Sequence, residues 1–350
     1  MIWLTWRQLR GSAAMMAAVL VIFAVALALT GPDLASGYSA GITACAQDDT
    51  CGRFYDRFFG AYEMPFMAVS LVVLLLPALV GLFWGAPLIS RELEAGTHLL
   101  VWNQSITRGR WLAVKLGLTG LTAMAAACLC GLMVTWWSAP LDNSAPGNLA
   151  LMAPLVFGAR GIAPMGYAAF AFVLGVTVGM LVRRTLPAMA LTLTVFAAIQ
   201  LAMPLLVRPH LMPSITAPFE LGRANVDSIN IPRDGGRYPT ITLNSAVPGH
   251  AGAWVLTNNL LDPSGRAIAG GDGGAPIRIS TTSGPCAPSG SAAGQDGCLA
   301  EINRLGYRQQ ATYQPLERFW PLQWIETGIY AVLTLALTWL SFRWIRRRLP

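Results

Sequence analysis

Residues 64–90 read MPFMAVSLVVLLLPALVGLFWGAPLIS and contain no charged side chain. A helix of about 20 apolar residues crosses the hydrocarbon core of a bilayer, so this stretch is long enough to span a membrane. Comparable charge-free windows lie at 11–32, 116–141, 161–182, 185–207 and, somewhat shorter, 327–342. The sequence therefore predicts an all-α polytopic membrane protein with six transmembrane helices.

The overall composition supports a membrane protein. Of 350 residues, 54% are hydrophobic and only 12% are charged, whereas a soluble domain carries about 25% charged residues. An ordinary soluble domain and a disordered chain are therefore excluded. A seventh charge-free window, 143–159, is short and interrupted by Pro146 and Pro154, which favours an outer loop or a re-entrant segment over a further span.

The distribution of basic residues predicts the orientation in the membrane. Short cytoplasmic loops of membrane proteins are enriched in Lys and Arg. If both termini are cytoplasmic, the inner segments carry twelve basic residues, Arg7, Arg10, Arg91, Arg108, Arg110, Lys115, Arg183, Arg184, Arg343, Arg346, Arg347 and Arg348, against the two acids Glu92 and Glu94. The net charge of +7 is then a signal of topology, and no nucleic-acid partner is predicted.

The spans divide the chain into three regions. Residues 1–207 are predicted to hold an N-terminal interfacial helix and transmembrane helices 1–5, residues 208–322 an extracytoplasmic domain, and residues 323–350 the sixth helix with a basic cytoplasmic tail. Residues 2–10 have the amphipathic spacing of an interfacial helix, but a continuation of the first span explains them equally well. A cleavable signal is the less favoured alternative for the first hydrophobic run, because that run is long and the even helix count requires it.

Two outer segments are expected to connect the spans. Residues 31–63 are predicted to form a loop, and the domain at 208–322 is predicted to be small, mixed and irregular. Within it, 240–243 and 254–256 have the composition of short strands. The Gly- and Ser-rich stretch 270–297 is expected to be an irregular loop.

Four cysteines fall in the predicted outer segments. Cys45 and Cys51 lie in the first, and Cys286 and Cys298 in the second. In an oxidising compartment such spacing predicts disulfides, with local pairs favoured and cross-loop bridges left open. A metal site is the less favoured alternative, because no histidine is close to any of these cysteines in sequence, and no metal ligands are predicted.

The inner loop at 89–111 contains both predicted cytoplasmic acids. Glu92 and Glu94 lie beside Arg91, which suggests either a docking surface or charges that merely solvate the loop. Gly96 and Thr97 can end one helical turn and begin the next segment, and Ser105 or Thr107 can cap the third span ahead of Arg108.

This loop resembles that of the type-2 ABC transporter permeases, the membrane subunits of ABC exporters with the type V fold. The residues that match are Arg91, Glu92, Glu94, Gly96 and Thr97 in the first half, and Ser105, Thr107, Arg108 and Lys115 in the second. The order of six spans with an outer domain before the last also agrees. The stretch from Tyr313 to Glu326 is similar to the actinobacterial branch of these permeases. The resemblance implies that the loop rests on a separate ATPase subunit dimer, and that a second permease copy or a similar permease completes the pathway.

The sequence itself predicts no enzyme. A P-loop needs Gly-Lys-Ser/Thr, but the only lysine is Lys115, preceded by Val114. ATP and Mg are therefore expected on the partner, with no cofactor and no catalytic residue in this chain. No charged residue lies in the core of a predicted span, which suggests a hydrophobic or amphipathic cargo for a protein of the bacterial plasma membrane in contact with membrane lipid. A membrane enzyme would need an acid/base pair at the outer surface, where Glu63 or Glu326 could serve, but neither has an evident partner. The alternative is a non-transporting sensor or assembly module with a ligand-binding outer domain.

Overall fold

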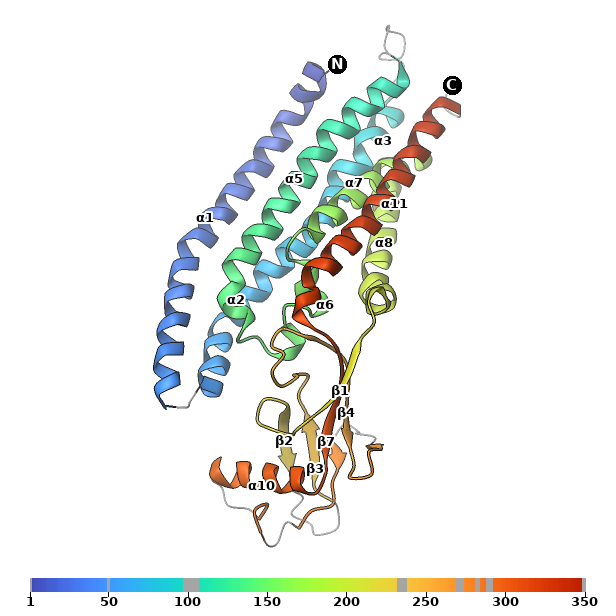
Figure 1. Ribbon diagram of the computed structural model, residues 1–350. Helices are drawn as coiled ribbons and strands as arrows, with labels where there is room; N and C mark the ends of the chain where they lie inside the picture. Colours follow the sequence, from blue (N-terminus) through green and yellow to red (C-terminus); the bar gives the residue numbers. More distant parts are fainter. Residues whose placement is uncertain are drawn as a thin grey trace.

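A computed structural model describes residues 2–48, 51–96, 107–231, 238–268, 274–280, 284–287 and 292–347. Within them, six helical segments are long and apolar enough to cross a membrane: Ala13–Ala46, Phe54–Glu94, Arg108–Asp142, Gly147–Val182, Thr185–Leu211 and Leu316–Arg347. They run side by side as a bundle, and a smaller β-rich domain lies at one end (Figure 1). The prediction of six spans in a mostly helical protein is confirmed.

The first two helices extend well past the predicted spans. Helix α1 (Ile2–Asp48) is continuous, so no break separates residues 2–10 from the span, and α2 begins at Cys51 and ends at Leu79. The prediction of a loop over 31–63 is therefore wrong. Hydroxyl groups of Ser36, Ser39 and Thr43 bond to carbonyl groups of the preceding turn, which is compatible with helix beyond the apolar run. The Cys45–Cys51 disulfide closes the tip of this helical hairpin.

Helix α7 (Ala163–Val182) is the innermost helix of the bundle. In its most apolar window 83% of residues are buried, against 6% for α1. It packs against α5 (Arg108–Asp142) and α11 (Phe319–Arg347). It also packs against the π-helix η1 (Val80–Gly85) and the helix α3 (Ala86–Glu94) that directly follows it. Helix α7 therefore forms the core of the bundle, whereas α1 presents most of its surface outward.

Glycines allow α7 to approach η1 and α3 closely. A Cβ atom on Gly175 would lie 2.5 Å from the carbonyl oxygen of Gly81, and one on Gly179 would lie 2.5 Å from that of Ala86. On the facing side, a Cβ on Gly85 would lie 2.5 Å from the carbonyl oxygen of Phe172. Contacts between small residues are a common means of packing helices in membranes, where the hydrophobic effect does not drive their association.

Residues 143–162 form a broken, buried connection between α5 and α7. It contains the 3-10 turn η2 (Gly147–Leu149) and the short helix α6 (Pro154–Gly158). Met152, Phe157 and Arg160 are fully buried there. Such irregular backbone inside a membrane protein needs internal partners for its polar groups, and the residues described below supply some of them.

Helix α8 (Thr185–Ala202) continues through the π-helix η3 (Met203–Val207) and the single turn α9 (Arg208–Leu211) into the β-rich domain. Two antiparallel sheets form this domain. The first has the order β1-β7-β4-β5, and the second has the order β2-β3-β6. Their strands are β1 (Ile215–Phe219), β2 (Val226–Asn230), β3 (Thr240–Leu243), β4 (Trp254–Leu261), β5 (Ala267–Ile268), β6 (Ala275–Pro276) and β7 (Arg308–Gln314).

Helix α10 (Ala292–Arg304) packs Leu299 and Ile302 into the core of this domain, and the Cys286–Cys298 disulfide ties it to the preceding loop. The strands predicted at 240–243 and 254–256 are confirmed by β3 and β4. The stretch 270–297 is not wholly irregular, because β6 and the start of α10 lie in it. Both disulfides are the local pairs among the alternatives that the spacing left open.

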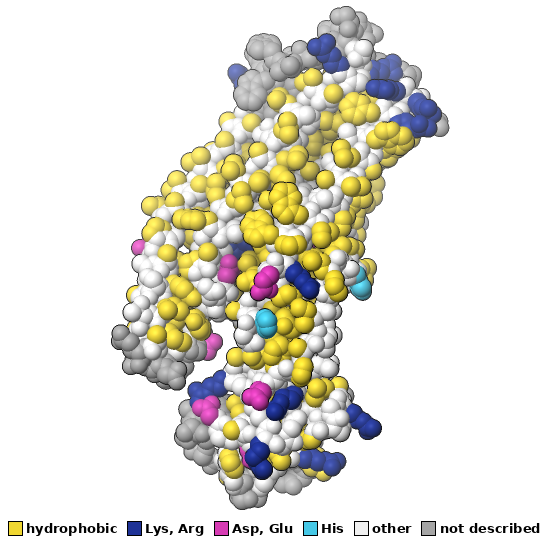
Figure 2. All heavy atoms as spheres, viewed as in Figure 1, with side chains coloured by type: hydrophobic (Ala, Val, Ile, Leu, Met, Phe, Trp, Pro, Cys, Tyr) yellow, Lys and Arg dark blue, Asp and Glu magenta, His cyan; other side chains and the backbone are white. Residues whose placement is uncertain are grey.

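The two ends of the molecule differ in charge. The β-rich domain lies at one end of the molecule (Figure 1). At the opposite end, called the first end below, lie the amino end of α1, the end of α3, the start of α5, the Arg183–Arg184 turn and the carboxyl end of α11. On the face shown, dark blue Lys and Arg side chains gather at the first end with no magenta acidic side chain in view, whereas both colours occur toward the second end (Figure 2). The packing of the helices thus places at one end of the molecule the basic segments that were predicted to lie on one side of the membrane.

Candidate functional site

The two acids of the 89–111 segment bind residues of their own chain. Glu92, near the end of α3, forms an ion pair with Lys115 of α5. Lys115 is 5% exposed and lies 4.8 Å from the ring centroid of Trp111, one turn earlier on α5. This partly desolvated ion pair fastens α3 to α5, so Glu92 does more than solvate a loop.

Glu94 fastens the same helix to α8. Its Oε2 accepts hydrogen bonds from the backbone nitrogen of Thr185, at 3.0 Å, and from the Thr185 hydroxyl, at 2.8 Å. Thr185 begins α8, and the preceding residue, Arg184, provides no side-chain cap. A carboxylate from another helix therefore satisfies a free N–H group and complements the helix dipole at this terminus.

The other residues of the predicted coupling segment have varied positions. Arg91 is exposed, Gly96 adopts φ of +68° just after α3, and Arg108 is half-buried at the start of α5. The Thr107 hydroxyl accepts a hydrogen bond from the Arg110 nitrogen at 3.4 Å and caps α5. Thr97 and Ser105 lie outside the described residues. The structure thus brings Glu92, Lys115 and Glu94 together around α3, and their role in coupling stays a prediction.

A second polar cluster lies buried at the opposite end of the bundle. Arg208 of α9 makes a bidentate ion pair with Glu326 of α11, with Nε–Oε2 at 2.7 Å and Nη2–Oε1 at 2.9 Å. The Tyr167 hydroxyl of α7 donates to the same carboxylate. The Arg208 and Glu326 side chains are 2% and 0% exposed. The expectation that Glu326 lacks a partner is therefore wrong. The prediction that the cores of the spans carry no charged residue is unaffected, because Arg208 and Glu326 flank the charge-free windows.

Aromatic rings and amide groups surround this ion pair. The Arg208 guanidinium lies 4.1 Å from the ring centroid of Phe157 in α6 and 5.9 Å from that of Trp254 in β4. Gln323, one turn before Glu326, accepts from the Ala163 nitrogen at 2.8 Å and donates to the Phe157 carbonyl at 3.0 Å. The cluster therefore joins four segments of the bundle to the first sheet of the β-rich domain.

Arg160 provides another buried charge in the broken connection. Its Nη1 donates to the Val134 carbonyl at 2.6 Å, and its Nη2 lies 3.6 Å from Oδ1 of Asp142. Within the described part of the chain, Arg160 Nε and Nη2 and Asp142 Oδ1 have no hydrogen-bond partner. The Phe66 ring lies 5.0 Å from the guanidinium. This arginine holds residues 143–162 against α5 and α2.

The sequence contained a signal for the Arg208–Glu326 pair that the prediction missed. Arg208 directly follows the charge-free window 185–207, and Glu326 directly precedes the window 327–342. The fifth span and the sixth span run in opposite directions, so both residues lie at the same end of adjacent helices. Opposite charges at the ends of membrane-spanning segments favour pairing, because an isolated charge close to the hydrocarbon core is costly.

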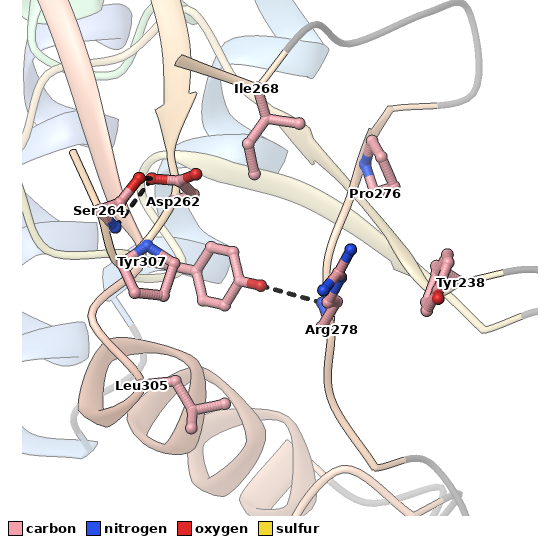
Figure 3. Close-up of a pocket in the computed structure, with 9 residues that line it drawn as sticks. Tyr238, Asp262, Ser264, Ile268, Pro276, Arg278, Leu305 and Tyr307 are labelled. Atoms are coloured by element: carbon pink, nitrogen blue, oxygen red, sulfur yellow. Dashed lines mark hydrogen bonds between the residues drawn. The ribbon is translucent and has the colours of Figure 1, made fainter. Parts of the chain in front are cut away.

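The β-rich domain has a pocket of about 630 Å³ that is lined by the turn after β4, by β5 and β6, and by the residues that follow α10. In Figure 3 the Tyr307 ring projects across it, and its hydroxyl accepts a hydrogen bond from the Arg278 backbone nitrogen at 3.0 Å. Asp262 at the rim is held by the Ser264 hydroxyl and by backbone N–H groups, and these hydrogen bonds lower the pKa of the Asp262 carboxyl. No group of three or more His, Cys, Asp or Glu side chains suited to a metal ion occurs among the described residues.

Comparison with known proteins complements this geometry. The profile of the family described as ABC-2 membrane transporter related matches residues 17–208, which is more than half of the chain. The chain belongs to this family. The resemblance to type-2 ABC transporter permeases is thereby confirmed, whereas the actinobacterial branch stays a prediction.

The ABC-2-related match covers the first five spans and ends at Arg208. It includes α3, the acids Glu92 and Glu94, and their partners on α5 and α8. It leaves out the β-rich domain and α11, so the residues that contact Arg208 from β4 and α11 lie beyond the matched region. Neither the curated proteins nor the solved structures contain a match to the chain. The family and the apolar helices identify a multi-pass membrane protein that is a component of a membrane transporter.

Proposed function

We propose that this ABC-2-related protein is the permease subunit of an ATP-driven exporter in a bacterial plasma membrane, with ATP and Mg bound by a separate dimer of ATPase subunits. A second permease copy, or a similar permease, completes the pathway. The basic end of the bundle faces the cytoplasm together with both termini, and the β-rich domain over 208–322 is extracytoplasmic. The family match supports a transporter component, and the clustered basic residues support this orientation.

The observation that carries the proposal is the double attachment of α3. Glu92 binds Lys115 of α5, and Glu94 binds Thr185 of α8. A force applied by an ATPase subunit to the 89–111 segment would reach both helices through these two contacts. It would also reach α7, because Gly179 lies directly against Ala86 at the start of α3. Closure of the ATPase dimer can thereby move three helices of each permease subunit together.

The cargo is proposed to be hydrophobic or amphipathic. The buried arginines Arg208 and Arg160 form ion pairs with Glu326 and Asp142 of the same chain, at the end of the bundle next to the β-rich domain. These ion pairs stabilise the irregular backbone between the helices. The helix surfaces that remain to line a pathway are mainly apolar, which suits a lipid, a drug or an apolar peptide.

A charge exchange tests the proposed coupling. The protein is purified with the ATPase that accompanies it, and cargo-stimulated ATP hydrolysis is measured after reconstitution. We expect Lys115→Glu alone to uncouple hydrolysis from transport, and Glu92→Lys combined with Lys115→Glu to restore much of the coupling, because the intramolecular pair is re-formed. Arg57→Glu, an exposed change at the opposite end, serves as the control. Full coupling in the Lys115→Glu variant would refute the proposed route of the force.

A second candidate function is a sensor or assembly module, and the pocket beside Tyr307 favours it (Figure 3). A sensor requires a ligand site in the outer domain but no ATPase bound to the 89–111 segment. Purification from the native membrane distinguishes the two. Recovery of the chain with an ATPase that contains a P-loop favours the exporter, and recovery with another signalling protein in its place favours the sensor.

A further inference from the structure

The last turns of α11 carry a groove at the basic end of the molecule. It has a volume of about 570 Å³, and the described residues that line it belong to α11. Its apolar and basic lining residues are Leu335, Trp339, Phe342, Arg343, Arg346 and Arg347. Their spacing of three, four and seven residues places them along one side of the helix. The groove is therefore apolar toward the middle of the bundle and basic toward the helix end.

The side chains of this groove are open to the surroundings. Leu335 is 68% exposed and Trp339 is 63% exposed, and Arg343, Arg346 and Arg347 are all exposed. The Arg343 guanidinium lies 5.5 Å from the ring centroid of Trp339. Arg346 lies near Gly109 in the first turn of α5, because a Cβ atom on that glycine would be 3.8 Å from Nη2. No ion pair with an acid involves these three arginines in the described part of the chain.

We propose that this groove binds an acidic phospholipid of the adjoining leaflet. With a rise of about 1.5 Å per residue, Arg346 lies roughly 10 Å further along the helix than Trp339. Trp339 then lies at the interface between acyl chains and headgroups, where tryptophan is enriched, and the arginines reach the phosphate level. Leu335 and Phe342 contact an acyl chain, and the guanidinium groups donate hydrogen bonds to the phosphate and to an anionic headgroup.

Charge argues against a second copy of the chain as the occupant. Two copies in one membrane have the same orientation, so a symmetric contact along this side of α11 would place each arginine near its equivalent. Among the described residues that line the groove there is no acid to offset that repulsion. An acidic lipid supplies the missing negative charge and also matches the apolar part of the groove.

Native mass spectrometry of the full-length protein in neutral detergent tests the proposal. The protein is titrated with phosphatidylglycerol and, separately, with phosphatidylcholine, and inorganic phosphate is added as a competitor. We expect tighter binding of phosphatidylglycerol, insensitive to phosphate. Each arginine near an anionic surface contributes roughly a fivefold gain in affinity, so Arg343→Gln should weaken binding about fivefold and the triple change of Arg343, Arg346 and Arg347 to Gln on the order of a hundredfold.

A matched control is available at the same end of the molecule. Arg183→Gln with Arg184→Gln removes two exposed arginines from the turn between α7 and α8, and should leave the lipid affinity unchanged. The single Arg343→Gln variant keeps the test valid if the triple variant fails to fold. The proposal is overturned by equal binding of the two lipids, by displacement with phosphate alone, by an equal loss in the Arg183/Arg184 control, or by unchanged binding in the Arg343 variant.

Discussion

Breaking the buried Arg208–Glu326 pair should strongly destabilise the protein. In Glu326→Met, Arg208 loses both short contacts to the carboxylate, at 2.7 and 2.9 Å. Among the described residues, the other hydrogen bond of Arg208 is from Nη1 to the Pro154 carbonyl at 3.5 Å. Removing one partner of a buried pair costs about 3–5 kcal/mol, because the other charge is left in a low dielectric. We expect Glu326→Met and Arg208→Met each to lower the free energy of unfolding by that amount.

The double variant distinguishes an uncompensated charge from simple loss of packing. With both residues changed to Met, no buried charge remains, and a hydrophobic pair of similar volume often replaces a buried ion pair at little cost. The Tyr167 hydroxyl still loses its acceptor, which costs about 1–3 kcal/mol. We therefore expect the double variant to be more stable than either single variant, although less stable than the wild type.

Unfolding in mixed micelles, followed by the loss of helical circular dichroism, measures these differences. The matched control is Glu63→Met, because Glu63 is exposed on α2 and its replacement should change stability by no more than about 0.5 kcal/mol. Single variants as stable as this control would refute the internal role of the pair. A double variant as unstable as the two single losses added together would show no coupling between the two residues, and would contradict the argument from an uncompensated charge.

Three further predictions concern other contacts. Gly175→Ala should destabilise the bundle by about 1–3 kcal/mol, because its Cβ would meet the Gly81 carbonyl oxygen at 2.5 Å, whereas Gly117→Ala, in open space on α5, should be neutral or stabilising in the same unfolding assay. Glu94→Ala should lower stability by removing the cap of α8, and should be non-additive with Thr185→Ala in a double-mutant cycle. Replacing Cys286 and Cys298 by Ser opens a loop with a sequence separation of 12 and should cost the β-rich domain about 3 kcal/mol, visible as faster hydrogen exchange in α10 while exchange in α7 is unchanged.

The helical architecture was predictable because it depends on long apolar runs. Charge-free windows locate all six spans, since a membrane helix must satisfy its own backbone and exclude charges. They do not show where a helix ends outside the apolar region, so the extension of α1 to Asp48 and the start of α2 at Cys51 were missed. The strands β1, β2 and β7 also escaped prediction, because their sequences mix polar and apolar residues without strict alternation.

The candidate sites were predictable only in part. The 89–111 segment was recognisable from its cluster of charges, but the partner of Glu92 lies 23 residues away and that of Glu94 lies 91 residues away. The Arg208–Glu326 pair spans 118 residues and depends on how α9 and α11 meet. Such contacts follow from packing between helices, which a single sequence does not specify.

Site-specific crosslinking tests whether an ATPase binds the 89–111 segment. A photoreactive amino acid replaces exposed Arg91 beside the double attachment of α3 or, as a control, exposed Arg57 near the tip of the α1–α2 hairpin. Each variant is irradiated in the native membrane, and the crosslinked proteins are identified by mass spectrometry. We expect a crosslink from position 91, and none from position 57, to an ATPase that contains a P-loop. Absence of that ATPase at position 91, or its equal capture from position 57, would contradict the proposed coupling.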